Sequence, residues 1–159
     1  MRQSEIPLNH LAASGGVTTA LIQLGHAAKI QVWVTGRTEE KRALARKLGA
    51  DQTFASGVYL PQQVDAVFDN VGAATRKHSM KNVRTGGTIV VSGATTGDKP
   101  EAMLRRVFVD SISVHGSYAS TLQEFKSMLT FVTTRGIKPH RQRSPDGSGG
   151  RRFPPSLER

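Results

Sequence analysis

The feature that most constrains the fold of this chain is a regular alternation of short β-rich runs with amphipathic helical segments. Residues 30–34, IQVWV, form a compact run of β-formers. They are followed by TEEKRALARKLGA, a helical segment with Thr38 as candidate N-cap and Gly49 as candidate stop. A helix between two strands returns the chain to the same end of a sheet, so the alternation favours parallel pairing.

The same alternation extends along most of the 159 residues. The patterns predict helices over 15–28, 38–50, 74–83, 99–111 and 122–132. They predict strands over 30–34, 52–55 and 112–118, a strand that runs into a loop over 64–72, and a turn followed by a buried strand over 86–93. The fold class is therefore α/β: a three-layer, Rossmann-type, doubly wound parallel sheet with ligands at the carboxyl ends of its strands.

Both ends of the chain depart from this order. IPLNHLA at 6–12 stands where the first strand is expected, but Pro7, Asn9 and His10 are poor residues for a central buried strand. From residue 140 onward the sequence has no periodicity and is rich in Pro, Gly, Ser and Arg. We expect one domain over 1–139 and a disordered basic tail over 140–159.

Composition limits where the protein works. The chain contains no cysteine, which excludes disulfides, thiolate zinc sites and cysteine nucleophiles and suits a reducing compartment. No apolar run approaches the length that crosses a bilayer, and the first residues, MRQSEIPLNHL, lack the apolar core of a secretory signal. We expect a cytoplasmic protein with no membrane partner.

The formal net charge of +10 indicates a partner that carries phosphate, either a nucleotide or a nucleic acid. Segments 37–47 and 140–159 each hold five basic residues against two acidic ones, a net charge of +3. The Phe and Tyr residues are not grouped as in RNA-binding motifs that stack bases. A basic nucleic-acid-binding module is therefore the second interpretation, and solvated surface accounts for much of the charge.

The stretch AASGGVTT, residues 12–19, is a candidate phosphate-binding turn. Ser14, Gly15 and Gly16 precede an amphipathic helix whose N-terminal amides can face a pyrophosphate. No Gly-Lys-Ser/Thr follows, so the stretch is not a Walker loop. Thr18 stands where a third glycine is usual, and its β-carbon is expected to crowd the packing of helix against strand.

The end of the second expected strand indicates which dinucleotide is favoured. Folds that bind NAD place an acidic residue about 20 positions after the glycines, where it binds the ribose hydroxyls. Here VTGRTEEK provides Gly36 and Arg37 instead of an acid. Arg37 can pair with a 2′-phosphate, and Lys41 follows within reach on the next helix. The pattern favours NADP(H) over NAD(H). The alternative interpretation is that Arg37 and Lys41 are charges that face solvent and bind no ligand.

Five motifs strengthen this interpretation: ASGGV before ALIQLGHAA, then VTGRTEEKRALARKLGAD, VDAVFDNVG, GGTIVVSGAT and VHGS. Over roughly residues 12–139 their order and spacing resemble the cofactor domain of the medium-chain dehydrogenase/reductases, specifically the zinc-independent, quinone-oxidoreductase-like branch. The resemblance implies NADP(H) as cofactor, no zinc, and hydride transfer from NADPH to a conjugated carbonyl such as a quinone or enone.

The resemblance also implies roles for the matching positions, although it assigns no catalytic residue. The implied cofactor-binding residues are Ser14, Gly15, Gly16 and Val17 at the pyrophosphate, Gly36, Arg37 and Lys41 at the 2′-phosphate, Asn70 and Val71 at the adenine and ribose, and Ser92, Gly93, Ala94, Gly116 and Ser117 at the nicotinamide. The strand over 112–117 is implied to pair with its copy in a homodimer.

The family pattern is not complete in this sequence. Within these 159 residues the motifs match the cofactor domain alone, and a basic tail stands where the family's strand and helix are expected after Pro139. We therefore expect a truncated relative that needs a separate catalytic domain and has little activity alone. An inactive relative is the third interpretation.

Other catalytic sites find less support in the sequence. Neither Tyr59 nor Tyr118 has a lysine four residues later, as a short-chain reductase would need. The five histidines share no metal-binding spacing. Asp65 and Asp69 fit structural roles at a strand better than paired catalysis, and Trp33 fits the core of a central strand.

Overall fold

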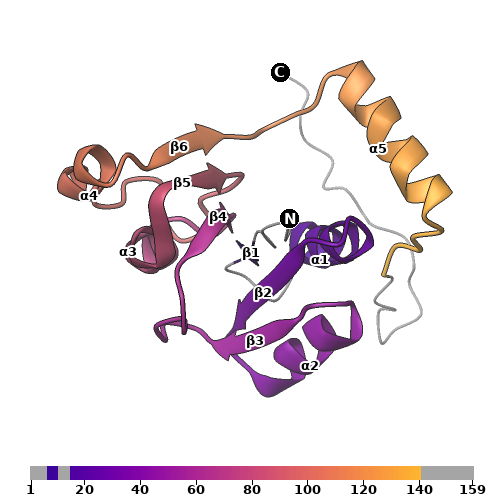
Figure 1. Cartoon of the computed structure of the whole chain (residues 1–159), viewed down its shortest axis with the longest axis horizontal. Coiled ribbons are helices and arrows are strands. Elements are labelled where there is room, and N and C mark those ends of the chain that lie inside the picture. The colour runs from indigo at the N-terminus through magenta and orange to yellow at the C-terminus, as the bar shows by residue number, and fades with distance from the viewer. Residues whose placement is uncertain (1–6, 11–14, 141–159) are drawn as a thin grey trace, which may run out of the picture.

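The computed structural model describes residues 7–10 and 15–140 of the chain. These residues form a six-stranded sheet with helices around it (Figure 1). The strands are β1 (Pro7–His10), β2 (Gln31–Gly36), β3 (Gln52–Ala55), β4 (Val64–Asp69), β5 (Val83–Val91) and β6 (Ser113–Gly116). The helices are α1 (Gly16–Ala27), α2 (Glu39–Lys47), α3 (Ala73–Asn82), α4 (Leu104–Val109) and α5 (Leu122–Thr134).

The strand order is β3-β2-β1-β4-β5-β6, and every pairing is parallel. The order reverses at β1, which pairs with β2 on one side and with β4 on the other. Such a reversal defines a doubly wound sheet and creates the crevice in which ligands bind. The predicted α/β class and Rossmann-type topology are confirmed.

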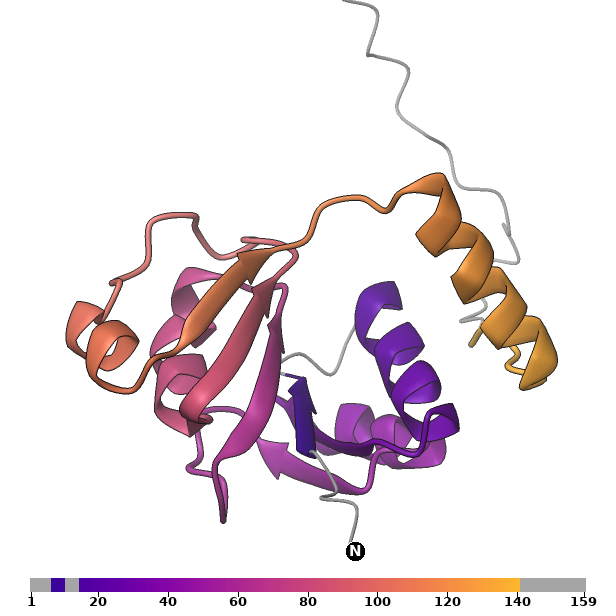
Figure 2. The same cartoon turned by 45° about the horizontal axis from the view of Figure 1, so that its top comes forward.

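Alternate residues of β2 pack into two different cores, so the molecule has three layers. Val32 and Val34 lie in a buried cluster with Ile22 of α1 and Ala45 of α2. Trp33, on the opposite face, lies in the larger cluster with residues of β4, α3 and β5. It was predicted to lie in the core, and it does. Figure 2 shows α1 and α2 on one side of the sheet and α3 and α4 on the other.

The predicted α2 and β3 agree closely with the structure. The Thr38 hydroxyl accepts a hydrogen bond from the Lys41 amide, as an N-cap does. The predicted helix over 99–111 is reduced to α4, because Met103 adopts a left-handed backbone conformation (φ 47°) immediately before it. The turn expected at 86–87 lies inside β5, where the register against β4 shifts.

The backbone of β1 forms a central strand despite the unfavourable residue types at Pro7, Asn9 and His10. Pro7 is its first residue, a position where the missing amide hydrogen is tolerated. Thr18 is fully buried in the first turns of α1, which still packs against the sheet. The expected tail over 141–159 lies outside the described residues.

Helix α5 forms where the stripe of Leu122, Phe125, Met128, Leu129 and Val132 predicts it. It begins with a capping box between Thr121 and Glu124. The helix stands away from the sheet in both views and buries none of its own residues (Figures 1 and 2). None of the described helices has the length and apolar character that a membrane span requires.

Gly25 permits the close approach of α1 to β2. A β-carbon built at this position would lie 2.6 Å from Cγ2 of Val32, a side chain that is itself fully buried. Gly25→Ala should therefore destabilise the fold by about 1–2 kcal/mol, because overpacking outweighs the better helix propensity of alanine. Urea unfolding followed by circular dichroism measures this change.

The control for this prediction is a double-mutant cycle with Val32→Ala, which removes the methyl group that clashes. In that background Gly25→Ala should be close to neutral or stabilising. A stabilising effect of Gly25→Ala in the wild-type background would contradict the packing argument.

Candidate functional site

The carboxyl ends of β2 and β4 border a cavity of about 340 Å³. These strands flank β1, so the cavity lies at the point where the strand order reverses. Its walls come from the loops after β2, β3, β4 and β5 and from the first turns of α2 and α3. The lining residues are Thr35, Gly36, Arg37, Lys41, Ser56, Asn70, Val71, Ala74, Thr75, Thr95 and Thr96.

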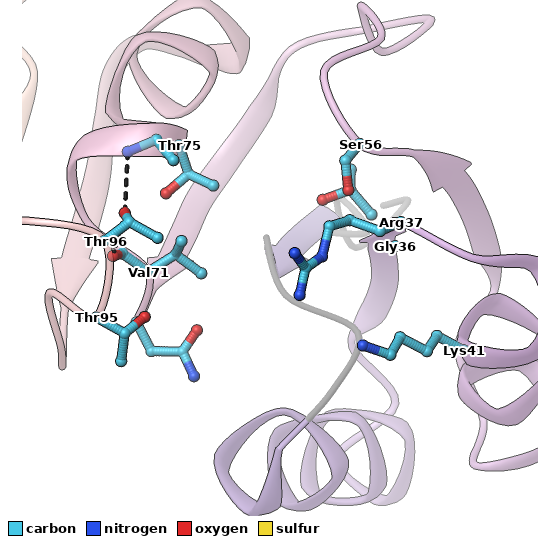
Figure 3. A pocket seen from close by; sticks show the side chains of 11 residues that line it. Gly36, Arg37, Lys41, Ser56, Val71, Thr75, Thr95 and Thr96 are labelled. Carbon is cyan, nitrogen blue, oxygen red and sulfur yellow. Dashed lines mark hydrogen bonds between the residues drawn. The ribbon is translucent and has the colours of Figure 1, made fainter.

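One wall of the cavity carries two positive charges (Figure 3). Gly36 ends β2, Arg37 lies in the turn that follows, and Lys41 lies in the first turn of α2. Arg37 is exposed and has neither a hydrogen-bond nor an ion-pair partner among the described residues. Its guanidinium group is therefore available to a ligand in the cavity.

The neighbouring Arg42 has a different role. Its Nη1 donates to the Gly36 carbonyl oxygen at 2.7 Å, and its Nε donates to Oε2 of Glu39 at 3.0 Å. Hydrogen bonds from Arg46 and Arg42 hold the pKa of the Glu39 carboxyl below its usual range. Glu39 therefore stays ionised and neutralises these two arginines rather than the cations that line the cavity.

Glu40 also stays ionised beside the cavity without lining it. Its own backbone amide and the Thr38 hydroxyl lower the pKa of its carboxyl group. The described residues that line the cavity include no Asp and no Glu, so its charged side chains are Arg37 and Lys41. The cavity is electropositive and suits an anionic group.

The opposite wall of the cavity is neutral and rich in hydroxyl groups. Thr96 joins its two loops, because its hydroxyl accepts from the Ala74 amide at 3.0 Å and donates to the Val71 carbonyl oxygen at 2.8 Å (Figure 3, dashed line for the first). The Thr96 amide donates to the same Val71 oxygen at 2.9 Å. The loop after β5 is thereby fixed to the start of α3.

Asp69, the last residue of β4, organises this wall from beneath. Its buried carboxylate accepts from the backbone amides of Val71 and Gly72 at 3.0 and 3.1 Å. It also accepts from the hydroxyls of Thr75 and Ser79 on α3, each at 2.9 Å. This one side chain connects the end of β4, the loop that carries Val71 and the first turns of α3, in the structural role expected for it.

The structure brings five of the predicted site residues together in the cavity: Gly36, Arg37, Lys41, Asn70 and Val71. Gly15, Gly16 and Val17 lie at the start of α1 and are exposed. The predicted nicotinamide residues lie along the same edge of the sheet: Gly116 ends β6, Ser117 follows it, and Ser92, Gly93 and Ala94 follow β5. Ser14 lies outside the described residues.

Gly93 lets the loop after β5, which carries predicted nicotinamide residues, pack against the loop after β4, which carries Asn70 and Val71. A β-carbon at Gly93 would lie 2.9 Å from the carbonyl oxygen of Asn70, so a side chain there would separate the loops after β4 and β5. Ser92 adds a hydrogen bond from its amide to the Asp69 carbonyl oxygen at 2.9 Å. The loops that carry the predicted adenine and nicotinamide positions are therefore packed against each other.

The sequence patterns missed six lining residues, namely Thr35, Ser56, Ala74, Thr75, Thr95 and Thr96. Thr35 and Ser56 could have been found from their places at the ends of expected strands, where such sheets bind ligands. The threonines of the neutral wall carry no motif, since only the packing of two loops brings them to the cavity. Among the described residues no group of three or more His, Asp or Glu side chains could hold a metal ion.

The family model described as zinc-binding dehydrogenase matches residues 16–134, which is most of the chain. A zinc-type alcohol dehydrogenase-like protein, YogA, of Leptosphaeria maculans is 28% identical over 141 residues, covering 79% of this chain and 38% of that protein. The chain thus spans about two fifths of the length of the curated relatives that it matches over most of its own length.

Two further comparisons concern the chemistry and the fold. A 2-methylene-furan-3-one reductase of Solanum lycopersicum is 35% identical over 92 residues, covering 54% of this chain and 23% of that enzyme. A crotonyl-CoA carboxylase/reductase, AntE V350A, solved in complex with NADP, superposes with a TM-score of 0.78 at 18% identity. That superposition covers 84% of this chain and 42% of the other, and it shows the shared fold.

Asp69→Asn should destabilise the protein by about 2 kcal/mol or more, because the amide nitrogen would face hydrogen-bond donors and leave at least one of them unsatisfied. The matched control is Asp65→Asn on the same strand, which breaks a partly exposed ion pair with Arg84. That change should cost less than about 1 kcal/mol. Urea unfolding of both variants gives the comparison, and equal losses would contradict the organising role of Asp69.

Proposed function

The chain belongs to the zinc-binding dehydrogenase family, within the medium-chain dehydrogenase/reductase superfamily, and we propose that its cavity binds the adenosine end of NADP(H). The observation that supports NADP(H) over NAD(H) is the charge of the lining. Arg37 follows the end of β2, Lys41 lies in the first turn of α2, and the described lining residues include no acid that could accept from ribose hydroxyls. A 2′-phosphate can pair with the Arg37 guanidinium in this position.

The remaining cofactor positions follow the carboxyl edge of the sheet. In this proposal Gly15, Gly16 and Val17 face the pyrophosphate at the start of α1, where unpaired helix amides favour an anion. Asn70 and Val71 border the adenine and ribose. The nicotinamide is assigned to the loop after β5 and the end of β6, namely Ser92, Gly93, Ala94, Gly116 and Ser117.

We further propose that the domain serves a reductase that transfers hydride from NADPH to a conjugated carbonyl. The bound cofactor supplies the hydride, and the protein holds the nicotinamide at the edge of the sheet. The 2-methylene-furan-3-one reductase, whose name describes a substrate of this class, supports the proposal. The substrate must face the nicotinamide across a cleft, so we propose a separate catalytic domain as the partner of residues 1–139.

The proposed reaction uses no zinc, although the family is described as zinc-binding dehydrogenase. The described residues do not fit a zinc site, since none of their His, Asp and Glu side chains gather in threes, and the chain has no cysteine. The conjugated carbonyl is accordingly proposed to react without a metal held by this domain.

The first experiment is a titration with NADPH and with NADH at fixed salt, followed by nicotinamide fluorescence. NADPH should bind more tightly, and Arg37→Ala should weaken NADPH about tenfold while leaving NADH nearly unchanged, because one charge-assisted hydrogen-bonded pair is lost. The matched control is Lys47→Ala, which removes an exposed cation from the last turn of α2, outside the cavity.

Equal weakening of both cofactors by Arg37→Ala would contradict the assignment of Arg37 to the 2′-phosphate. Absence of saturable binding to either cofactor would contradict the proposed function. In that case an inactive relative or the basic nucleic-acid-binding module remains, and a steep decrease of nucleic-acid affinity with salt would identify the second.

We also propose that the strand region 112–117 forms a homodimer contact. Strand β6 is the edge of the sheet beside β5, and all four of its residues are exposed. Val114→Lys should convert a dimer to a monomer in sedimentation equilibrium, because a charged lysine blocks pairing between edge strands. Leu129→Lys, on the exposed side of α5, is the control that should leave the dimer intact. A wild-type monomer would exclude this contact.

A further inference from the structure

Tyr59 and Lys81 form a pair on the surface, outside the cofactor cavity. Tyr59 lies in the loop between β3 and β4, and Lys81 lies in the last turn of α3. The Lys81 Nζ donates to the Tyr59 hydroxyl at 2.7 Å and lies 5.2 Å from the centroid of the phenol ring. Neither residue lines the cavity, so the cofactor proposal does not use this pair.

The loop that carries Tyr59 is anchored to α3 on both sides of the tyrosine. Before it, the Val58 carbonyl oxygen lies 2.6 Å from Nε2 of His78. After it, the amide of the buried Leu60 donates to Oδ1 of Asn82 at 3.0 Å. The phenol is therefore held at Lys81 by a fixed backbone, while 71% of the Tyr59 surface stays exposed to solvent.

We propose that Tyr59 is a nucleophilic modification site that takes acyl or sulfonyl groups from small activated electrophiles. The pair provides the two requirements of such a site, an accessible phenol oxygen and a cation fixed beside it. It also differs from the Tyr-Lys arrangement of short-chain reductases, because the two residues are 22 positions apart and join a loop to a helix.

The cation beside the phenol favours its ionised, reactive form. The hydrogen bond from Lys81 and its positive charge lower the pKa of the Tyr59 hydroxyl, and the charge of Lys77 acts in the same direction. A lower pKa also weakens the intrinsic nucleophilicity of the oxygen. For thiolates this loss is smaller than the gain in ionised fraction, and we extend the same balance to the phenolate.

The reaction with a sulfonyl fluoride shows the balance of atoms. The phenol proton leaves to solvent, and the phenolate oxygen attacks the sulfur. An O–S bond forms, the S–F bond breaks, and fluoride leaves with the bonding electron pair. No oxidation or reduction takes place. The Lys81 side chain takes no part in the bond changes; its charge faces the negative charge that develops on the sulfonyl oxygens.

The test treats the 159-residue chain with benzenesulfonyl fluoride at neutral pH and maps the label by peptide mass spectrometry. The chain contains two tyrosines, so Tyr118 is an internal reference. Tyr118 is fully exposed and has no hydrogen-bond partner among the described residues. Tyr59 should react several-fold faster than Tyr118, although it is the less exposed of the two.

Variants separate the role of Lys81 from exposure. Lys81→Met should lower the rate at Tyr59 to that of Tyr118, Lys81→Arg should retain most of the difference, and Lys126→Met, on α5, should leave it unchanged. Circular dichroism verifies that each variant is folded. Equal rates at the two tyrosines in the wild type would overturn the proposal. So would an unchanged rate at Tyr59 in a folded Lys81→Met variant, or label on Lys81 in place of Tyr59.

Discussion

The buried carboxylate of Asp69 is the interaction on which the binding edge of this domain depends. A charge removed from water is stable only when hydrogen bonds replace its hydration. Four groups donate to Asp69, two of them backbone amides in the loop after β4 and two of them hydroxyls on α3. The Asp69 carbonyl oxygen accepts from Ser92 after β5 as well, so the ends of β4 and β5 and the start of α3 form one unit.

The fold was predictable because helix and strand periods alternate almost throughout the sequence. The run Val32, Trp33 and Val34 predicts a buried strand, and in the structure each of these side chains packs in one of the two cores. The extent of α4 was not predictable, because Met103 adopts a left-handed conformation that its residue type does not favour. The residue types of β1 are unfavourable for a central strand. Its backbone nevertheless forms one, because it pairs in parallel with β2 on one side and with β4 on the other.

The residues of the basic wall of the cavity could be predicted from the sequence, whereas most residues of the neutral wall could not. Gly36 ends β2 and Arg37 follows it, at the spacing where dinucleotide folds place their selective residue, so their position could be derived from the sequence. The neutral wall depends on contacts between loops that are distant in sequence. Thr96 reaches it through Ala74 and Val71, more than 20 positions away, and no local pattern encodes such a contact.

The net charge of +10 is a poor guide to the site, because most of the basic residues do not reach the cavity. In α2, Arg42 and Arg46 both pair with Glu39 and do not line the cavity. The cations of the lining are Arg37, in the turn before α2, and Lys41, in its first turn. The charges of two arginines of α2 are thus neutralised locally, while one cation before the helix and one in its first turn line the cavity. Selectivity for a 2′-phosphate requires this placement, since a uniformly basic surface would attract any polyanion equally.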